Sequence, residues 1–160
     1  MRIAMLFPLA VLTLVSGCSP QAKPPVAVSG KVTMKGKAVS GAMVQFVPTE
    51  TTGTIASGRT DATGSYTLFA AAGGEGVCPG QYKIVISRLL GPDGKEIPEG
   101  VSPHTSGGKE SLPKFYSDPN ETFLTAVVPP TTPATVDFPL TGQGGAAGGA
   151  GGAMGGVRGR

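Results

Sequence analysis

Apolar residues alternate with polar ones through most of this chain, and Gly and Pro interrupt the alternation every few residues. A period of two is typical of strands that bury one face, whereas an amphipathic helix repeats its apolar residues every three to four positions. No apolar repeat of helical period runs for long between the interrupting Gly and Pro residues. We therefore expect an all-β fold, with strands in seven segments: Val26 to Met34, Ala42 to Pro48, Ile55 to Thr60, Tyr66 to Leu68, Gln81 to Arg88, Phe123 to Val128 and Thr135 to Leu140.

A single sheet would leave one apolar face in water, so two sheets that face each other are predicted. The expected domain is one β-sandwich of about seven strands over residues 26–140, a length that buries enough apolar surface for modest stability. The side chains expected to face inward are Val28, Val32, Val44, Phe46, Tyr66, Leu68, Tyr82, Ile84, Ile86, Leu124, Val136 and Phe138.

The first 17 residues have a different pattern. Arg2 is followed by an apolar run to Val15 and by the small residues Ser16 and Gly17. A basic start, a short apolar run and a small-residue end are typical of a secretory signal peptide, which is removed from the mature protein. The run is too short for a membrane-spanning helix, which needs about 20 apolar residues.

The segment Leu14-Val15-Ser16-Gly17-Cys18 resembles the bacterial lipobox. The resemblance implies cleavage before Cys18 and acylation of its thiol, so that the protein contacts the membrane through lipid. Residues 18–25 would then be a tether, and Pro24 and Pro25 favour an extended one. Ser19 follows the Cys where an Asp would retain a lipoprotein in the inner membrane, which favours the outer membrane. The alternative is an ordinary signal peptide with an incidental Cys.

Charge and cysteine content exclude several classes of protein. The formal charge is +3, but residues 24–140 contain nine Lys and Arg against ten Asp and Glu, and no basic patch with interleaved aromatics. Nucleic acid is therefore not an expected partner. If Cys18 carries lipid, Cys78 has no partner for an intrachain disulfide. It is either a packed small residue or an exposed thiol that pairs between chains.

Two segments do not fit a minimal sandwich. Residues 89–121 are rich in Gly, Pro and charge, and so long a loop in a compact domain is either functional or partly disordered. Within it, Phe115 and Tyr116 are candidate partner contacts that would stack on a sugar or a peptide; alternatively they fasten the loop to the sandwich. Residues 141–160 are almost wholly Gly and Ala, and we expect a disordered tail.

The sequence contains no pattern that predicts catalysis, a cofactor or a metal. His104 is the single His and has no Cys, His or acidic neighbours at metal-ligand spacing. Asp61-Ala62-Thr63-Gly64 lacks the alternating oxygen ligands of a calcium loop and is instead predicted to be a turn, in which the Asp side chain bonds the following backbone. No nucleophile elbow or phosphate-binding glycine loop is present.

Several segments together are similar to carboxypeptidase regulatory-like domains. They are Val28-Ser29-Gly30-Lys31-Val32, the stretch from Gly36 to Phe46, Thr60-Asp61-Ala62-Thr63-Gly64-Ser65-Tyr66, and the strand from Pro79 to Ile86. The resemblance implies a transthyretin-like, or prealbumin-like, sandwich with no active site of its own. Residues 112–140, with the P-x-x-Y pattern from Pro113 to Tyr116 and the later pair Asp137-Phe138, resemble the distal half of small planctomycete-type lipoproteins.

The expected function is therefore that of a lipid-anchored cell-envelope module that binds an envelope protein or a polysaccharide, or has a structural role, without catalysis. One alternative is an accessory protein that presents a small ligand to an outer-membrane transport system. The other is an enzyme, which the sequence favours least.

Overall fold

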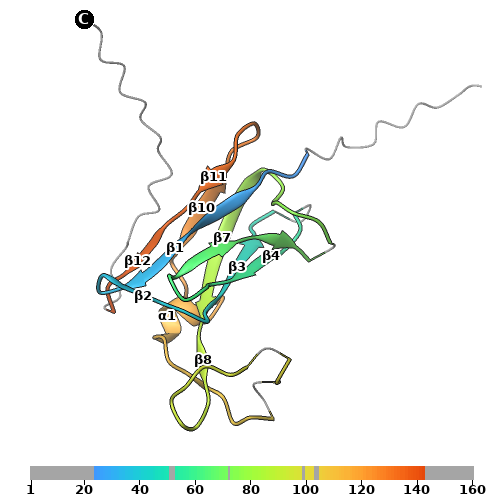
Figure 1. Cartoon of the computed structure of the whole chain (residues 1–160). Helices are drawn as coiled ribbons and strands as arrows, with labels where there is room; N and C mark the ends of the chain where they lie inside the picture. The colour runs from blue at the N-terminus through green and yellow to red at the C-terminus, as the bar shows by residue number, and fades with distance from the viewer. Residues whose placement is uncertain (1–23, 51–52, 72, 99, 103–104, 143–160) are drawn as a thin grey trace, which may run out of the picture.

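The computed structural model describes residues 24–50, 53–71, 73–98, 100–102 and 105–142 (Figure 1). Within these ranges the chain forms twelve strands and one helix of four residues. Seven of the strands have three or more residues, and the others have two. The expected all-β class is confirmed.

The first sheet is built around β1 (Val28–Met34). On one side β1 pairs antiparallel with β5 (Ser65–Thr67), and its end pairs antiparallel with β2 (Lys37–Ala38). On the other side it pairs in parallel with β11 (Ala134–Thr135) and β12 (Phe138–Leu140). The first and last strands of the domain are thus neighbours.

The second sheet is wholly antiparallel and has the order β10-β7-β3-β4-β6. Its central strands are β3 (Met43–Pro48) and β7 (Gly80–Ser87), the two longest in the sheet. The flanking strands are β10 (Thr125–Val128), β4 (Ala56–Arg59) and β6 (Phe69–Ala70). A separate pair, β8 (Leu89–Leu90) and β9 (Lys109–Glu110), lies beyond the end of β7.

The two sheets enclose one core. All twelve side chains that the alternation places inward are buried. Phe46 of the second sheet lies at the centre, with its ring centroid 5.7 Å from that of Tyr82 and 6.3 Å from that of Phe138 in the first sheet. The contact between Phe46 and Phe138 therefore joins the two sheets. Burial of each large apolar side chain stabilises the fold by about 1.5–3 kcal/mol.

The junction between β1 and the last strands depends on a glycine. β1 keeps one parallel register from Val28 opposite Ala134 to Val32 opposite Phe138. Between these pairs, the Tyr66 hydroxyl donates to the Val136 carbonyl at 2.6 Å. A Cβ on Gly30 would lie 1.8 Å from that carbonyl oxygen, so only glycine lets the strand approach this closely.

The turn at residues 61–64 forms by the predicted mechanism. The Asp61 carboxylate accepts hydrogen bonds from the backbone N–H of Thr63 at 2.7 Å and of Ser65 at 3.0 Å. Gly64 has a φ of +78°, a conformation that other residues rarely adopt. The hydrogen bond from the Thr63 hydroxyl is the main reason that the pKa of Asp61 is lowered.

Residues 89–121 contain more structure than the sequence predicted. They include β8, β9 and the short helix α1 (Lys114–Ser117), and the side chain of Ile97 is buried. The sequence did not predict β8 and β9 because strands of two residues are too short to show an alternation of apolar and polar residues. The rest of the segment is rich in turn-forming residues.

Three predictions fall outside the described residues. They concern the signal peptide with the lipidation site Cys18, the lack of metal-ligating neighbours for His104, and the disorder of the tail beyond residue 142. All three remain predictions. In the described ranges, no helix has the length and apolar character needed to cross a membrane.

Candidate functional site

The outer face of the second sheet presents side chains of mixed character. Met43 and Gln45 of β3 alternate with the buried Val44 and Phe46, and therefore point away from the core. Their cross-strand partners in β7 are Ser87 and Val85. Met43 is 39% exposed, whereas Val85 is only 5% exposed although it points outward. Another part of the chain must therefore cover this face.

The 89–121 segment provides this cover. Ile97 is 6% exposed and, with Pro98, lines the same cavity as Val85. Val101 and Pro119 line the cavity as well. The segment therefore folds back over the outer face of β3 and β7 and encloses a hollow between itself and the sheet.

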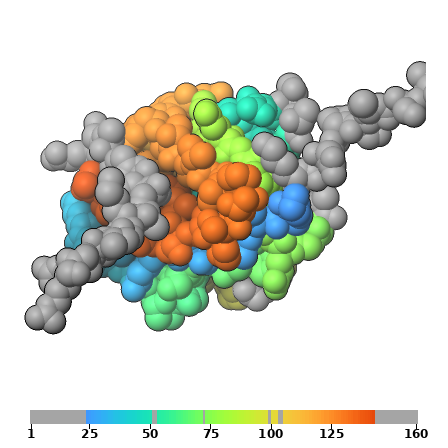
Figure 2. Space-filling view, turned by 90° about the horizontal axis from the view of Figure 1, so that it is seen from above, coloured from blue at the N-terminus to red at the C-terminus, as the bar shows by residue number. Residues whose placement is uncertain are grey.

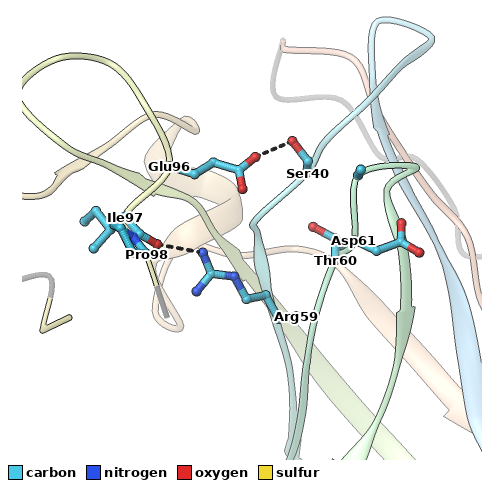
Figure 3. Close-up of a pocket in the computed structure, with 8 residues that line it drawn as sticks. Ser40, Arg59, Thr60, Asp61, Glu96, Ile97 and Pro98 are labelled. Carbon is cyan, nitrogen blue, oxygen red and sulfur yellow. Dashed lines mark hydrogen bonds between the residues drawn. The ribbon is translucent and has the colours of Figure 1, made fainter. Parts of the chain in front are cut away.

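Three side-chain contacts fasten the segment near Ile97, and Figure 3 shows two of them. The Arg59 guanidinium donates to the Ile97 carbonyl oxygen at 3.1 Å. The Ser40 hydroxyl donates to the Glu96 carboxylate. The third contact is an ion pair between Arg88 and the same carboxylate at 3.7 Å. Exposed ion pairs contribute only about 0–1 kcal/mol, so these contacts fix the position of the segment more than they stabilise the fold.

The two ends of the segment are also held together. The Glu110 carboxylate accepts hydrogen bonds from the Ser87 hydroxyl at 2.6 Å, from the Arg88 N–H at 2.9 Å and from the Leu112 N–H at 2.8 Å. β8 and β9 pair directly beside these bonds. Residues 91–108 therefore begin and end at one fixed point.

The hollow has a volume of about 480 Å³. We name it the outer groove and define it by Met43, Gln45, Arg59, Val85, Leu89 and Val101. A second cavity of about 430 Å³ lies beside it, with Ser40, Thr60, Asp61 and Glu96 in its wall. Arg59, Ile97 and Pro98 line both cavities and separate them.

Arg59 is the one charged side chain among the described residues that line the outer groove. A guanidinium has five N–H donors, and one of those of Arg59 is hydrogen-bonded to the Ile97 carbonyl oxygen. In the described ranges it forms no ion pair with a carboxylate, and the Glu96 carboxylate pairs with Arg88. The Asp61 carboxylate is held in its own turn and points away from Arg59 (Figure 3). The guanidinium therefore gives the groove a positive end.

The aromatic pair named from the sequence lies elsewhere. Tyr116 is fully buried against the core, and its hydroxyl accepts a hydrogen bond from the Thr141 N–H at 3.3 Å. The Phe115 ring packs against the Tyr116 ring with centroids 4.5 Å apart and stacks on Phe123 at 6.0 Å. These contacts match the alternative in which the pair fastens the segment to the sandwich. Only Phe115 keeps part of its surface free for a partner.

Cys78 is the one remaining candidate that lies within the described residues. Cys78 is free and partly exposed, and its carbonyl accepts a hydrogen bond from the Tyr82 hydroxyl at 2.7 Å. Among the described residues, no three or more His, Cys, Asp or Glu side chains lie close enough together to hold a metal ion. Cys18 and His104 lie outside these residues.

The sequence did not point to Arg59, Gln45 or Met43 as site residues, because each is an ordinary outward residue of a strand. The one available sign was Ile97, an isolated apolar residue between charged and turn-forming neighbours. Comparison of the chain with family models, curated proteins and solved structures gave no match.

Proposed function

We propose that this protein is a lipid-anchored cell-envelope module that binds a partner through the outer groove and catalyses no reaction. The observation that carries the proposal is the groove itself, which the described parts of the 89–121 segment form over one sheet face. Its volume falls within the range of about 300–1,000 Å³ that ligand sites occupy. Its lining combines apolar side chains with a few polar groups, as ligand sites do.

The position of the groove suits an anchored protein. Figure 1 places the start of β1 and the β8 region at opposite ends of the molecule. In the view from above, the start of β1 and the chain around β11 face the viewer (Figure 2). A lipid on Cys18 and a short tether to Val26 would hold the β1 end near the membrane. The groove would then face away from the membrane, toward a partner.

The acidic groups near the groove support a binding role rather than catalysis. Glu96 bonds Ser40 and Arg88, and Glu110 accepts three hydrogen bonds within its own segment. A general acid or base needs a proton-transfer group that is free to face the substrate. These carboxylates instead hold the groove in shape.

Within the all-β class, we propose that the fold is the transthyretin-like sandwich of carboxypeptidase regulatory-like domains. Three residues of the resembling turn have structural roles that account for the motif. Asp61 caps the turn, Gly64 has positive φ, and Tyr66 is buried with its hydroxyl on Val136. The motif is therefore explained by folding alone, without an active site.

The test is photo-crosslinking in cells of the source organism. A benzoylphenylalanine placed at Val101, which is 44% exposed in the groove wall, should give covalent adducts with an envelope protein or polysaccharide. The matched control is the same probe at Glu75, an exposed residue outside the groove lining, which should give none. Equal adduct yields at both positions, or none at Val101, would contradict the proposal.

A further inference from the structure

The floor of the outer groove contains a side-chain amide, that of Gln45, with no hydrogen-bond partner in the described part of the chain. The Gln45 side chain is exposed, points outward from β3 and makes no hydrogen bond with the described part of the chain. Its amide offers both donors and an acceptor, the same set that a backbone peptide group offers. The apolar side chains of Met43, Val85 and Leu89 line the same hollow. The floor thus offers apolar contact interrupted by one amide.

The wall of the groove supplies the charge. Arg59 contributes a guanidinium with free donors, and no described lining residue is acidic. The planar fork of a guanidinium matches a carboxylate and bonds it at two points. A ligand complementary to this lining has an apolar body, at least one amide and an anionic end.

We propose that the outer groove binds the C-terminal end of an extended peptide. The terminal carboxylate bonds Arg59, a peptide amide bonds Gln45, and apolar side chains pack on Met43, Val85 and Leu89. The proposal rests on the proposed function, because it names the ligand class of the same groove. An aliphatic acid would satisfy Arg59 but leave the Gln45 amide unused, which is why a peptide is favoured.

The experiment uses the purified full-length protein and the tripeptide acetyl-valyl-leucyl-phenylalanine. One form has a free C-terminal carboxylate, and the other is capped as the amide. Nuclear magnetic resonance titration should show the carboxylate form binding about 5-fold more tightly, as expected for one partly exposed ion pair. The preference should shrink at about 1 M salt, where the Debye length falls to about 3 Å. The signals that move should include the Gln45 side-chain amide.

Variants separate a contact with the carboxylate from an effect on groove shape. Arg59→Gln should abolish the preference for the carboxylate form, and Arg59→Lys should keep only part of it, because Lys lacks the planar fork. Ser40→Ala removes one of the two side-chain contacts of Glu96 but keeps Arg59, so the preference should persist. Lys37→Gln removes an exposed cation outside the groove lining and should change nothing. If Ser40→Ala abolishes the preference as fully as Arg59→Gln, Arg59 acts by holding the segment and the proposal is wrong.

Further outcomes distinguish this inference from the proposed function. Three results would contradict the proposal that the groove binds a peptide through its terminal carboxylate. They are equal binding of the carboxylate and amide forms, tighter binding of dodecanoate than of the peptide, and the absence of a saturable shift at about 10 mM peptide. If adducts from Val101 still form in cells, the groove remains a binding site for another ligand class. If those adducts are absent, the proposed function fails as well.

Discussion

Replacement of Gly30 by Ala tests the closest approach between strands in the first sheet. The added Cβ would lie 1.8 Å from the Val136 carbonyl oxygen and 2.9 Å from the Tyr66 hydroxyl, so the last strand must move away from β1. Overpacking of this kind costs about 1–3 kcal/mol. The displaced Tyr66 hydroxyl loses its buried partner, which costs about 1–3 kcal/mol more. The free energy of unfolding should therefore fall by about 2–6 kcal/mol.

The measurement is urea unfolding followed by circular dichroism, with Gly80→Ala as the matched control. Gly80 also lies in a strand, but a Cβ there would meet no atom closer than 3.8 Å, and its φ is not positive. At Gly80 the substitution should leave stability unchanged or raise it by about 0.4–1 kcal/mol, because Ala restricts the unfolded chain. The variant Gly30→Ala with Tyr66→Phe should lose less stability than the sum of the two single changes, since both act on one contact. Equal stabilities of Gly30→Ala and Gly80→Ala would refute the reasoning.

Three further predictions concern the core, the alkaline limit of stability and the anchor. Ile84→Ala should cost about 2–5 kcal/mol, and Lys83→Ala on the outer face within about 0.5 kcal/mol, in the same unfolding assay; equal costs would contradict the two-sided burial. Burial raises the pKa of Tyr66 well above its ordinary value of 10.0, so the unfolded chain loses this proton first and stability should fall as the pH rises above about 10. Tyr66→Phe should make that decline shallower, and an unchanged slope would show that Tyr66 is not its source. Cys18→Ala should release the protein from membranes in detergent partitioning, whereas normal processing and retention of the variant would exclude lipid on Cys18.

The core could be predicted because burial in a strand depends on local sequence. Val44, Phe46, Ile84 and Ile86 each alternate with polar or less buried neighbours, so one strand at a time shows which side faces inward. The turn at Asp61 could be predicted for the same reason, since the hydrogen bonds that its carboxylate accepts come from residues within four positions.

The pairing of strands could not be predicted in this way. The parallel register between β1 and the last strands joins residues 106 positions apart, as the bond from the Lys31 N–H to the Asp137 carboxylate shows. Nothing in either segment specifies its partner, because alternation says only which face of a strand is buried. The requirement for glycine at position 30 follows from this pairing, so it could not be predicted from the sequence alone.

The groove was hidden for a related reason. Arg59 and Ile97 are 38 positions apart, and their contact forms only after the 89–121 segment folds back over the sheet. The sequence identified this segment as too long for a simple connection. It drew attention to Phe115 and Tyr116 because aromatic side chains are conspicuous in a polar segment. In the folded chain Tyr116 belongs to the core, and the groove is lined by ordinary residues of β3 and β7.

The central claim, that the outer groove is occupied by a partner in the cell, is tested most directly by hydroxyl-radical footprinting. The method compares oxidation of Met43 in intact cells with its oxidation in the purified protein, where this side chain is 39% exposed. Phe69, which is 48% exposed and does not line the groove, is the internal reference. We expect Met43 to be protected severalfold in cells while Phe69 reacts equally in both samples. Equal oxidation of Met43 in the two samples would contradict the account.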